Sequence, residues 1–171
     1  MCGILGYLGR RSFDTESFGA ALDTMAARGL TFVPTLTAFH QVVQFGHANR
    51  LPEDTLRRAS EMLEHLQTSL RRAIEMRVPV AAGTDYKHGS IALELELMVQ
   101  FGAAPKDALR AATKTASRLL RVDKTLGTLE QGKWADFIAV AGDPLANIGA
   151  VNRVQAVVLD GALVHSAQAA G

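Results

Sequence analysis

The sequence predicts an α/β fold in two parts. From residue 1 to about residue 120, short apolar segments alternate with helical patterns, which is typical of parallel βα units. From Val122 onward, the segments are short, rich in β-formers and separated by glycine and Asp-Pro turns. We therefore expect two domains, a βα domain of residues 1–121 and a small β-domain of residues 122–171.

The composition excludes several classes of protein. The 171 residues include 18 Lys and Arg against 17 Asp and Glu, a balance that indicates neither a nucleic-acid partner nor an anionic membrane surface. The one cysteine, Cys2, excludes an internal disulfide framework and fits a reducing compartment. No apolar segment approaches the roughly 18 residues of a membrane span, and the N-terminus lacks a signal-peptide pattern. We expect a soluble, cytoplasmic protein.

The first predicted elements are a strand and a helix. Residues 2–9, CGILGYLG, are apolar and glycine-rich and predict a strand with a turn. Asp14 is placed to cap the following helix, in which Phe18 and Met25 belong to an apolar series at helical spacing. Gly29 is expected to end this helix, because glycine readily adopts the left-handed conformation found beyond a helix C-terminus.

A strand, a loop and an amphipathic helix are predicted next. Residues 30–36, LTFVPTL, are apolar and β-branched and predict a strand. Residues 37–51 predict a long loop, with room for a helical turn, that carries His40 and His47. Pro52 and the two acids after it favour the start of a helix. The apolar stripe of this helix consists of Leu56, Ala59, Leu63, Leu66, Leu70, Ala73 and Ile74.

The remaining elements follow a second apolar strand. Residues 78–83, VPVAAG, predict a buried strand, and IALELELMVQFG predicts a helix that ends at Gly102. APKDALRAATKTASRLL predicts one further helix with Pro105 near its start. In the β-rich part, VQAVVLDGALVH predicts a hairpin around Asp160-Gly161, and Trp134 is expected to pack between the two parts.

Asp85 is the first candidate for chemistry. It follows the strand of residues 78–83, and functional residues of parallel βα folds gather at the carboxyl ends of strands. A carboxylate there can bind a metal or take a proton from a metal-bound water, whereas the plainer interpretation is a helix cap or turn residue. His88 follows three residues later, and its plainer interpretation is an exposed loop histidine.

From Leu30 to about Val164, the chain resembles the C-terminal part of the metal-dependent amidohydrolase superfamily. The resemblance is to its imidazolonepropionase and prolidase-like members. It lies in four stretches, which occur in the expected order and spacing: TFVPTL, VPVAAGTDYKHG, LELELMVQFGAAPKDALRAATKTASRLL and LGTLEQGKWADFIAVAGDPLANI.

This resemblance implies a fold and an activity. The fold would be part of a (β/α)8 barrel, about its last three βα units, with part of a C-terminal β-domain. The activity would be hydrolysis of a C–N bond in a small amide, cyclic amide or dipeptide-like substrate by water activated on a divalent metal, expected to be zinc. In the family the aspartate that corresponds to Asp85 binds the metal and moves the proton, and His88 is expected to contact the substrate.

Other parts of the family pattern are missing. The sequence has no His-x-His pair, and only about 120 residues precede the β-rich part, whereas a complete barrel takes about 250. Catalytic zinc normally has three protein ligands. We therefore expect a truncated member, in which His40 and His47 are substitute ligands or simply polar loop residues, and which self-associates or pairs with a missing N-terminal half. The alternative is a non-catalytic scaffold or assembly fragment.

A second resemblance concerns only the N-terminus. MCGILGYLG is similar to the start of class II glutamine amidotransferases, in which the cysteine corresponding to Cys2 attacks the glutamine amide. The similarity covers fewer than about 30 residues, and the Arg-Gly-Pro run of that family is broken because Leu30 follows Arg28-Gly29. The competing interpretation of Cys2 is a small apolar residue on a strand.

Overall fold

A computed structural model describes residues 15–86 and 91–167. The predicted strand at residues 2–9, the cap at Asp14, and the candidates Cys2 and His88 lie outside these residues. The described elements are α1 (Thr15–Arg28), α2 (Leu36–Phe45), α3 (Glu53–Glu75), α4 (Ile91–Gln100), α5 (Pro105–Ala112), α6 (Lys114–Leu119), β1 (Phe137–Val140), the 3-10 helix η1 (Ile148–Asn152), β2 (Val154–Leu159) and β3 (Ala162–Ser166).

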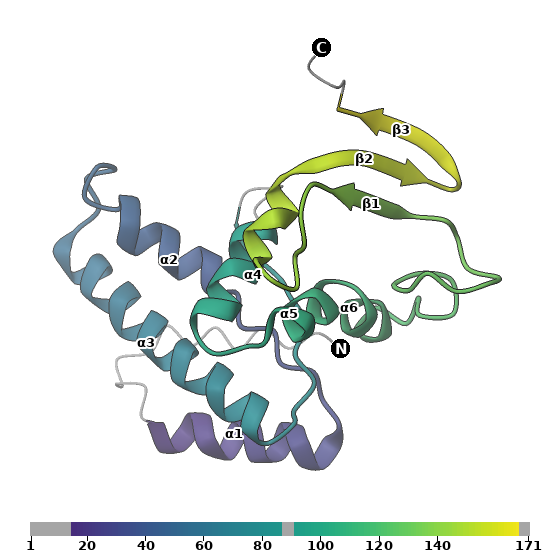
Figure 1. The fold of residues 1–171 in the computed structure, drawn as a ribbon. Helices are drawn as coiled ribbons and strands as arrows, with labels where there is room; N and C mark the ends of the chain where they lie inside the picture. The colour runs from purple at the N-terminus through teal and green to yellow at the C-terminus, as the bar shows by residue number, and fades with distance from the viewer. Residues whose placement is uncertain (1–14, 87–90, 168–171) are drawn as a thin grey trace.

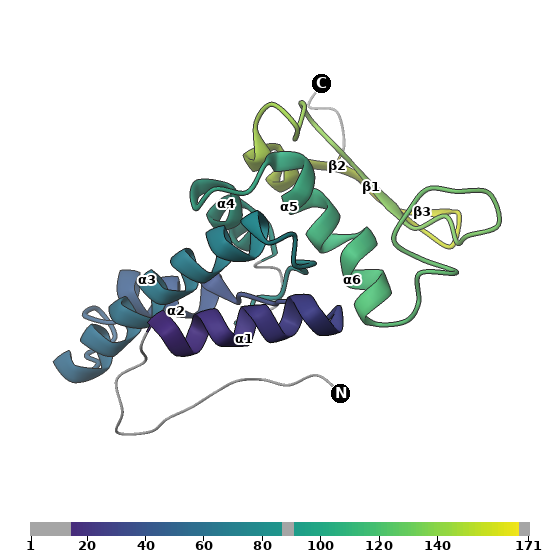
Figure 2. The same cartoon turned by 90° about the horizontal axis from the view of Figure 1, so that it is seen from below.

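Helices form one part of the molecule and an antiparallel sheet forms the other. The sheet has the strand order β1-β2-β3 and lies on the side of α4, α5 and α6, away from α1, in both views (Figure 1, Figure 2). Among the described residues, no helix is long and apolar enough to cross a membrane. The chain is therefore a mixed α/β structure, while the proposed domain boundary after residue 121 stays a prediction.

The long helix α3 organises the core as its sequence predicts. Six residues of its apolar stripe are buried, and Ile74 is half-buried. The stripe packs against α2 and α4, where Leu36, Leu97 and Met98 have at most 2% of their surface exposed. Burial of each large apolar side chain contributes about 1.5–3 kcal/mol to folding.

Several predicted boundaries and turns are confirmed. Gly29 has φ +61°, and the N–H of Leu30 donates to the carbonyl of Met25 at 2.9 Å, which ends α1. The predicted hairpin joins β2 to β3, with Asp160 and Gly161 at φ +49° and +77°. Positive φ at both central residues is the geometry of the tight turns that suit the twist of a hairpin.

The two predicted strands of the βα part pair with each other, but only briefly. Phe32 forms a parallel bridge with Val80, through N–H groups of Phe32 and Ala81 that donate at 2.8 and 2.9 Å. Pro34 and Pro79 lack an N–H, so the ladder loses donors on both sides of this bridge. The segments 30–36 and 78–83 are therefore adjacent and parallel, yet the pairing is limited to a single bridge.

The prediction of a long loop at residues 37–51 is wrong for residues 37–45 and is confirmed only for residues 46–51. Residues Leu36–Phe45 form α2, because Leu36, Phe39 and Val43 recur at helical spacing and pack on the core. Thr35, the residue before the helix, makes no capping bond with its side chain. Threonine is a usual residue at this position, so the sequence carries a sign of a helix N-terminus even though its side chain does not form the bond.

The prediction of one continuous helix after Gly102 is also wrong. Thr113, at φ −125° and ψ −92°, separates α5 from α6. The carbonyl of Ala111, just before the break, accepts a hydrogen bond from the N–H of Ala82 at 3.0 Å. A continuous helix would use that carbonyl internally.

Two side chains that precede β1, those of Trp134 and Asp136, differ in their contacts. Trp134 is 58% exposed, so the prediction that it packs between the two parts is wrong. Asp136 accepts a hydrogen bond from the N–H of Asp160 at 2.6 Å, which ties the approach to β1 to the hairpin turn. Its carboxylate therefore stabilises the fold at this turn.

Candidate functional site

The candidate site lies where the segments 30–35 and 78–85 end side by side. A Cβ atom at Gly83 would come within 2.8 Å of Cγ1 of Val33, so the close approach of the two segments requires glycine there. Asp85, two residues later, is exposed and has φ +44°. A non-glycine residue in this conformation is uncommon, although aspartate tolerates it better than most.

A buried carboxylate lies behind these segment ends. Glu94 on α4 has no exposed surface, and its Oε1 accepts a hydrogen bond from the N–H of Leu36 at 3.0 Å. Its Oε2 accepts bonds from the N–H and the hydroxyl of Thr37, at 2.8 and 2.7 Å. Burial raises the pKa of the Glu94 carboxyl above its ordinary value, and the hydrogen bonds from Thr37 and Leu36 partly oppose that shift.

The two candidate histidines do not join Asp85 in a cluster. His40 lies on α2, and its buried Nδ1 has no hydrogen-bond partner among the described residues. His47 is exposed beyond the end of α2, with Nδ1 3.5 Å from Oε1 of Glu53. Their proposed role as substitute ligands stays a prediction.

The described residues do not by themselves fit a catalytic metal. Within residues 15–86 and 91–167, no group of three or more His, Cys, Asp or Glu side chains is placed to hold an ion. A catalytic zinc takes three protein ligands and keeps one position open for water. Asp85 can therefore be at most one member of a ligand set that draws on residues outside the described part.

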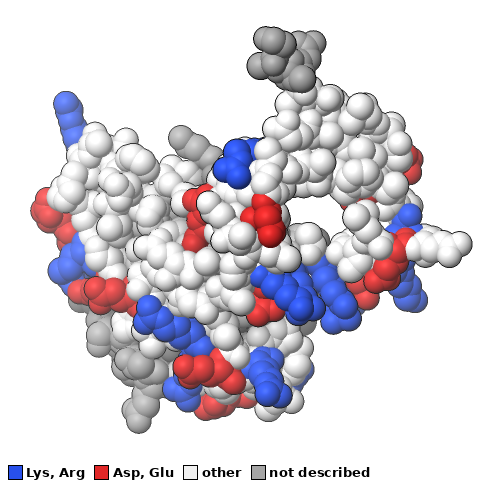
Figure 3. All heavy atoms as spheres, viewed as in Figure 1, with Lys and Arg blue, Asp and Glu red and all other residues white. Residues whose placement is uncertain are grey.

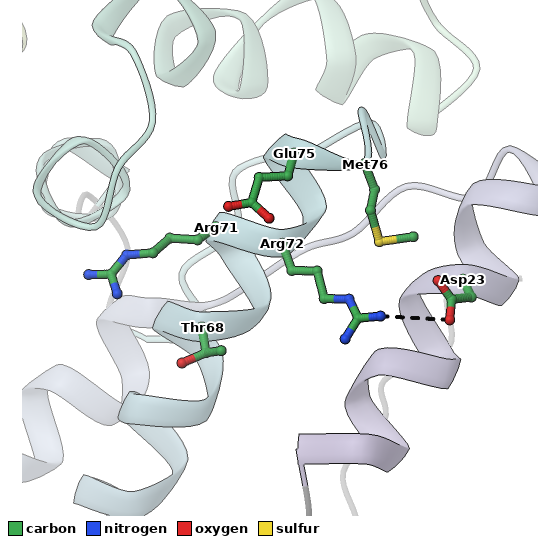
Figure 4. Close-up of a pocket in the computed structure, with 6 residues that line it drawn as sticks. All are labelled: Asp23, Thr68, Arg71, Arg72, Glu75 and Met76. Carbon is green, nitrogen blue, oxygen red and sulfur yellow. Dashed lines mark ion pairs between the residues drawn. The ribbon is translucent and has the colours of Figure 1, made fainter.

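An open pocket of about 550 Å³ occurs elsewhere, between α1 and α3 (Figure 4). Its arginines are already engaged: Nη2 of Arg72 lies 3.8 Å from Oδ2 of Asp23, and Nε of Arg71 donates to the carbonyl of Phe101 at 3.2 Å. None of the predicted site residues lines it. Basic and acidic side chains are both spread over the face seen in Figure 3, in keeping with the near-neutral charge.

Comparison with known proteins identifies the family. Residues 7–164 match the Amidohydrolase family, so the chain belongs to it. An imidazolonepropionase of Fusobacterium nucleatum is 31% identical over 113 residues, which are 60% of this chain and 27% of that protein. An imidazolonepropionase of Erwinia tasmaniensis is 41% identical over 68 residues, 36% of this chain and 17% of the relative.

Solved structures agree with this assignment. A crystal structure of an Xaa-Pro dipeptidase with bound methionine is 34% identical, with a TM-score of 0.78 over 86% of this chain and 37% of the other. The A. niger ochratoxinase is 26% identical, with a TM-score of 0.72 over 86% of this chain and 34% of the other. The chain thus spans well under half the length of these relatives.

Glu94 is not among the site residues predicted from the sequence. Its signal is nevertheless present, because Glu94 lies between Leu93 and Leu95 in a strongly apolar helix, three residues before the buried Leu97. An acid at helical spacing from core residues is unusual and indicates a specific partner. What the sequence does not reveal is that this partner is the start of α2.

Proposed function

We propose that the chain forms the last three or so βα units of a (β/α)8 barrel and part of its small β-domain, in a hydrolase that cleaves a C–N bond. The substrate class is a small amide, cyclic amide or dipeptide-like molecule. The observation that carries the proposal is the position of Asp85, directly after an apolar segment that pairs in parallel with its neighbour. Membership of the Amidohydrolase family supports it.

Asp85 is the proposed catalytic residue. Its exposed carboxylate is free of the core and can accept the proton of the attacking water and pass it to the leaving nitrogen. In the proposal it is also a ligand of a divalent metal, zinc, which would lower the pKa of water and polarise the carbonyl. We propose that the other ligands include residues outside the described part, with His40 and His47 as candidate substitutes, and that His88 contacts the substrate.

The surface of the sheet favours association with another chain. The β1-β2-β3 sheet exposes large apolar side chains, with Ile138, Leu163 and Val164 all more than half exposed. Exposed apolar surface and open strand edges favour association. We propose self-association or pairing with an N-terminal half, which would complete the barrel. The cytoplasmic location stays a prediction.

Metal content and hydrolysis test the proposal together. The purified chain is offered zinc, freed of excess and analysed by plasma mass spectrometry, and it is then assayed with a panel of small amides and dipeptides. We expect bound metal and measurable hydrolysis that falls about 10²–10⁴-fold in Asp85→Asn, the usual effect of losing a general base. Asp123→Asn makes the same change at an exposed aspartate and is the control.

Two results would favour other functions. A chain that holds no metal and hydrolyses nothing in the panel would favour the alternative of a non-catalytic scaffold. The amidotransferase alternative depends on Cys2, outside the described residues. Labelling of Cys2 by an electrophilic glutamine analogue would favour that alternative.

A further inference from the structure

The segment 32–37 contacts the residues that lead to Asp85 and is also bound by α4. Phe32 forms the parallel bridge to Val80, and a Cβ atom at Gly83 would come within 2.8 Å of Cγ1 of Val33. At the other end of the segment, Glu94 binds the N–H groups of Leu36 and Thr37. Residues 32–37 therefore connect α4 to Val80 and Gly83, which precede Asp85 by five and two residues.

The N-terminus of α2 depends on this distant carboxylate. The first N–H groups of a helix lack partners within the helix and are usually satisfied by the residue just before it. Thr35 makes no such bond, and Glu94, 58 residues away from Leu36 in sequence, satisfies two of these groups instead. The cap of α2 is thus also the link between α2 and α4.

The chemistry of the contact favours a carboxylate. Three donors converge on its two oxygens, and an ionised carboxylate accepts hydrogen bonds without presenting a donor of its own. A glutamine would turn an amide N–H toward one of these donors. An alanine would leave the N–H groups of Leu36 and Thr37 buried without partners, which is costly.

We propose that Glu94 is a positioning residue that fixes the Asp85 loop against the end of the neighbouring strand segment by capping α2 from α4. The inference deepens the proposed function, because it assigns to Asp85 a support in a different element. Glu94 does not touch the reacting atoms. It acts by holding residues 32–37 in place against Val80 and Gly83, shortly before Asp85.

Hydrogen–deuterium exchange of the whole chain tests the proposal. In Glu94→Ala, we expect the amides of Leu36 and Thr37 and those of residues 81–86 to exchange at least about tenfold faster, the effect of losing buried hydrogen bonds. The amides of α3 should keep their wild-type rates. The ¹³C resonance of the Asp85 carboxyl carbon should also move, a local signature that a general loss of stability does not produce.

Glu96→Ala is the matched control. Glu96 lies two residues further along α4, and its Oε1 accepts from Nδ2 of Asn152 of η1 at 2.6 Å, so its loss should leave residues 36, 37 and 81–86 unchanged. If Glu94→Ala does not fold, Thr37→Val, which removes only the hydroxyl donor, should give a smaller effect at the same positions.

The proposal would be overturned by unchanged exchange at residues 81–86 in a folded Glu94 or Thr37 variant. An equal acceleration across α3 would also overturn it, since Glu94 would then contribute only to global stability. None of these readouts needs a substrate or a metal. A failed hydrolysis assay would therefore contradict the proposed function and leave the role of Glu94 to be judged by exchange alone.

Discussion

The helical part buries its large apolar side chains, whereas the sheet leaves many of its apolar side chains exposed. In the helical part, Leu36 and Leu70 have no exposed surface and Met98 has 1%. In the sheet, Phe137 and Ile138 are neighbours in β1 and are 41% and 53% exposed. Because adjacent strand residues point to opposite faces, both faces of the sheet present apolar side chains.

This difference indicates which part forms a hydrophobic core from its own residues. An antiparallel sheet normally packs one face on a core and leaves the other to solvent. In Figure 3 the sheet and the segment after α6 border an opening, so the sheet does not lie flat on the helices. The helices form a core from their own residues, whereas within the described residues no layer covers the sheet.

The largest expected effect is at the centre of the helical core. Leu70→Ala should lower the free energy of unfolding by about 2–5 kcal/mol, because it removes buried methyl groups and leaves a cavity. The matched control is Leu163→Ala on the sheet, where the side chain is 63% exposed and the expected change is within about 0.5 kcal/mol. Equal changes in the free energy of unfolding for the two substitutions, measured in urea, would contradict the prediction.

A smaller effect is expected from the one buried acid of the described core. Glu94→Gln should cost about 1–3 kcal/mol, because a buried donor loses its acceptor. It should also change the pH dependence of stability. The folded-state pKa of Glu94 is raised above 4.5 by burial, so between pH 4.5 and that higher pKa the folded chain binds more protons than the unfolded chain.

The contribution of Glu94 to the free energy of unfolding decreases as the pH rises. The stabilising contribution of the raised pKa is fully present below about pH 4.5 and is lost as the pH rises through the folded-state pKa of Glu94. Asp54 and Glu130, whose pKa values are lowered by hydrogen bonds from Arg57 and Lys133, act in the opposite direction and are present in both proteins. The wild-type minus Glu94→Gln difference, measured by urea unfolding from pH 4 to 8, isolates Glu94. A difference that is constant with pH would contradict the prediction.

The smallest effect on stability is expected on the sheet, where association is the relevant readout. Leu163→Lys should change the unfolding free energy by no more than about 0.5 kcal/mol, since the side chain is mostly exposed. It should shift the chain toward the monomer in analytical ultracentrifugation, because a charge on an edge strand opposes pairing. A wild-type chain that is already monomeric at high concentration would contradict the proposed self-association.

Much of the local structure is determined by the sequence itself. The stripe of α3, the end of α1 at Gly29 and the hairpin at Asp160-Gly161 depend on interactions within a few residues. Such signals can be recognised in a sequence because helical periodicity and positive φ values restrict which residues can occur at each position. The family was predicted from a different signal, the resemblance of four stretches of the sequence to known members, and Asp85 was a candidate because it follows the apolar segment 78–83.

Features that depend on residues distant in the sequence could not be predicted from local sequence patterns. The N-terminus of α2 is capped by Glu94 rather than by Thr35, and α5 separates from α6 where the carbonyl of Ala111 accepts from the N–H of Ala82. Trp134 was placed in the interior by its type, yet no layer among the described residues covers it. A hydrogen bond between residues 58 apart leaves no periodic pattern in a sequence, so only the folded chain reveals that Glu94 caps α2.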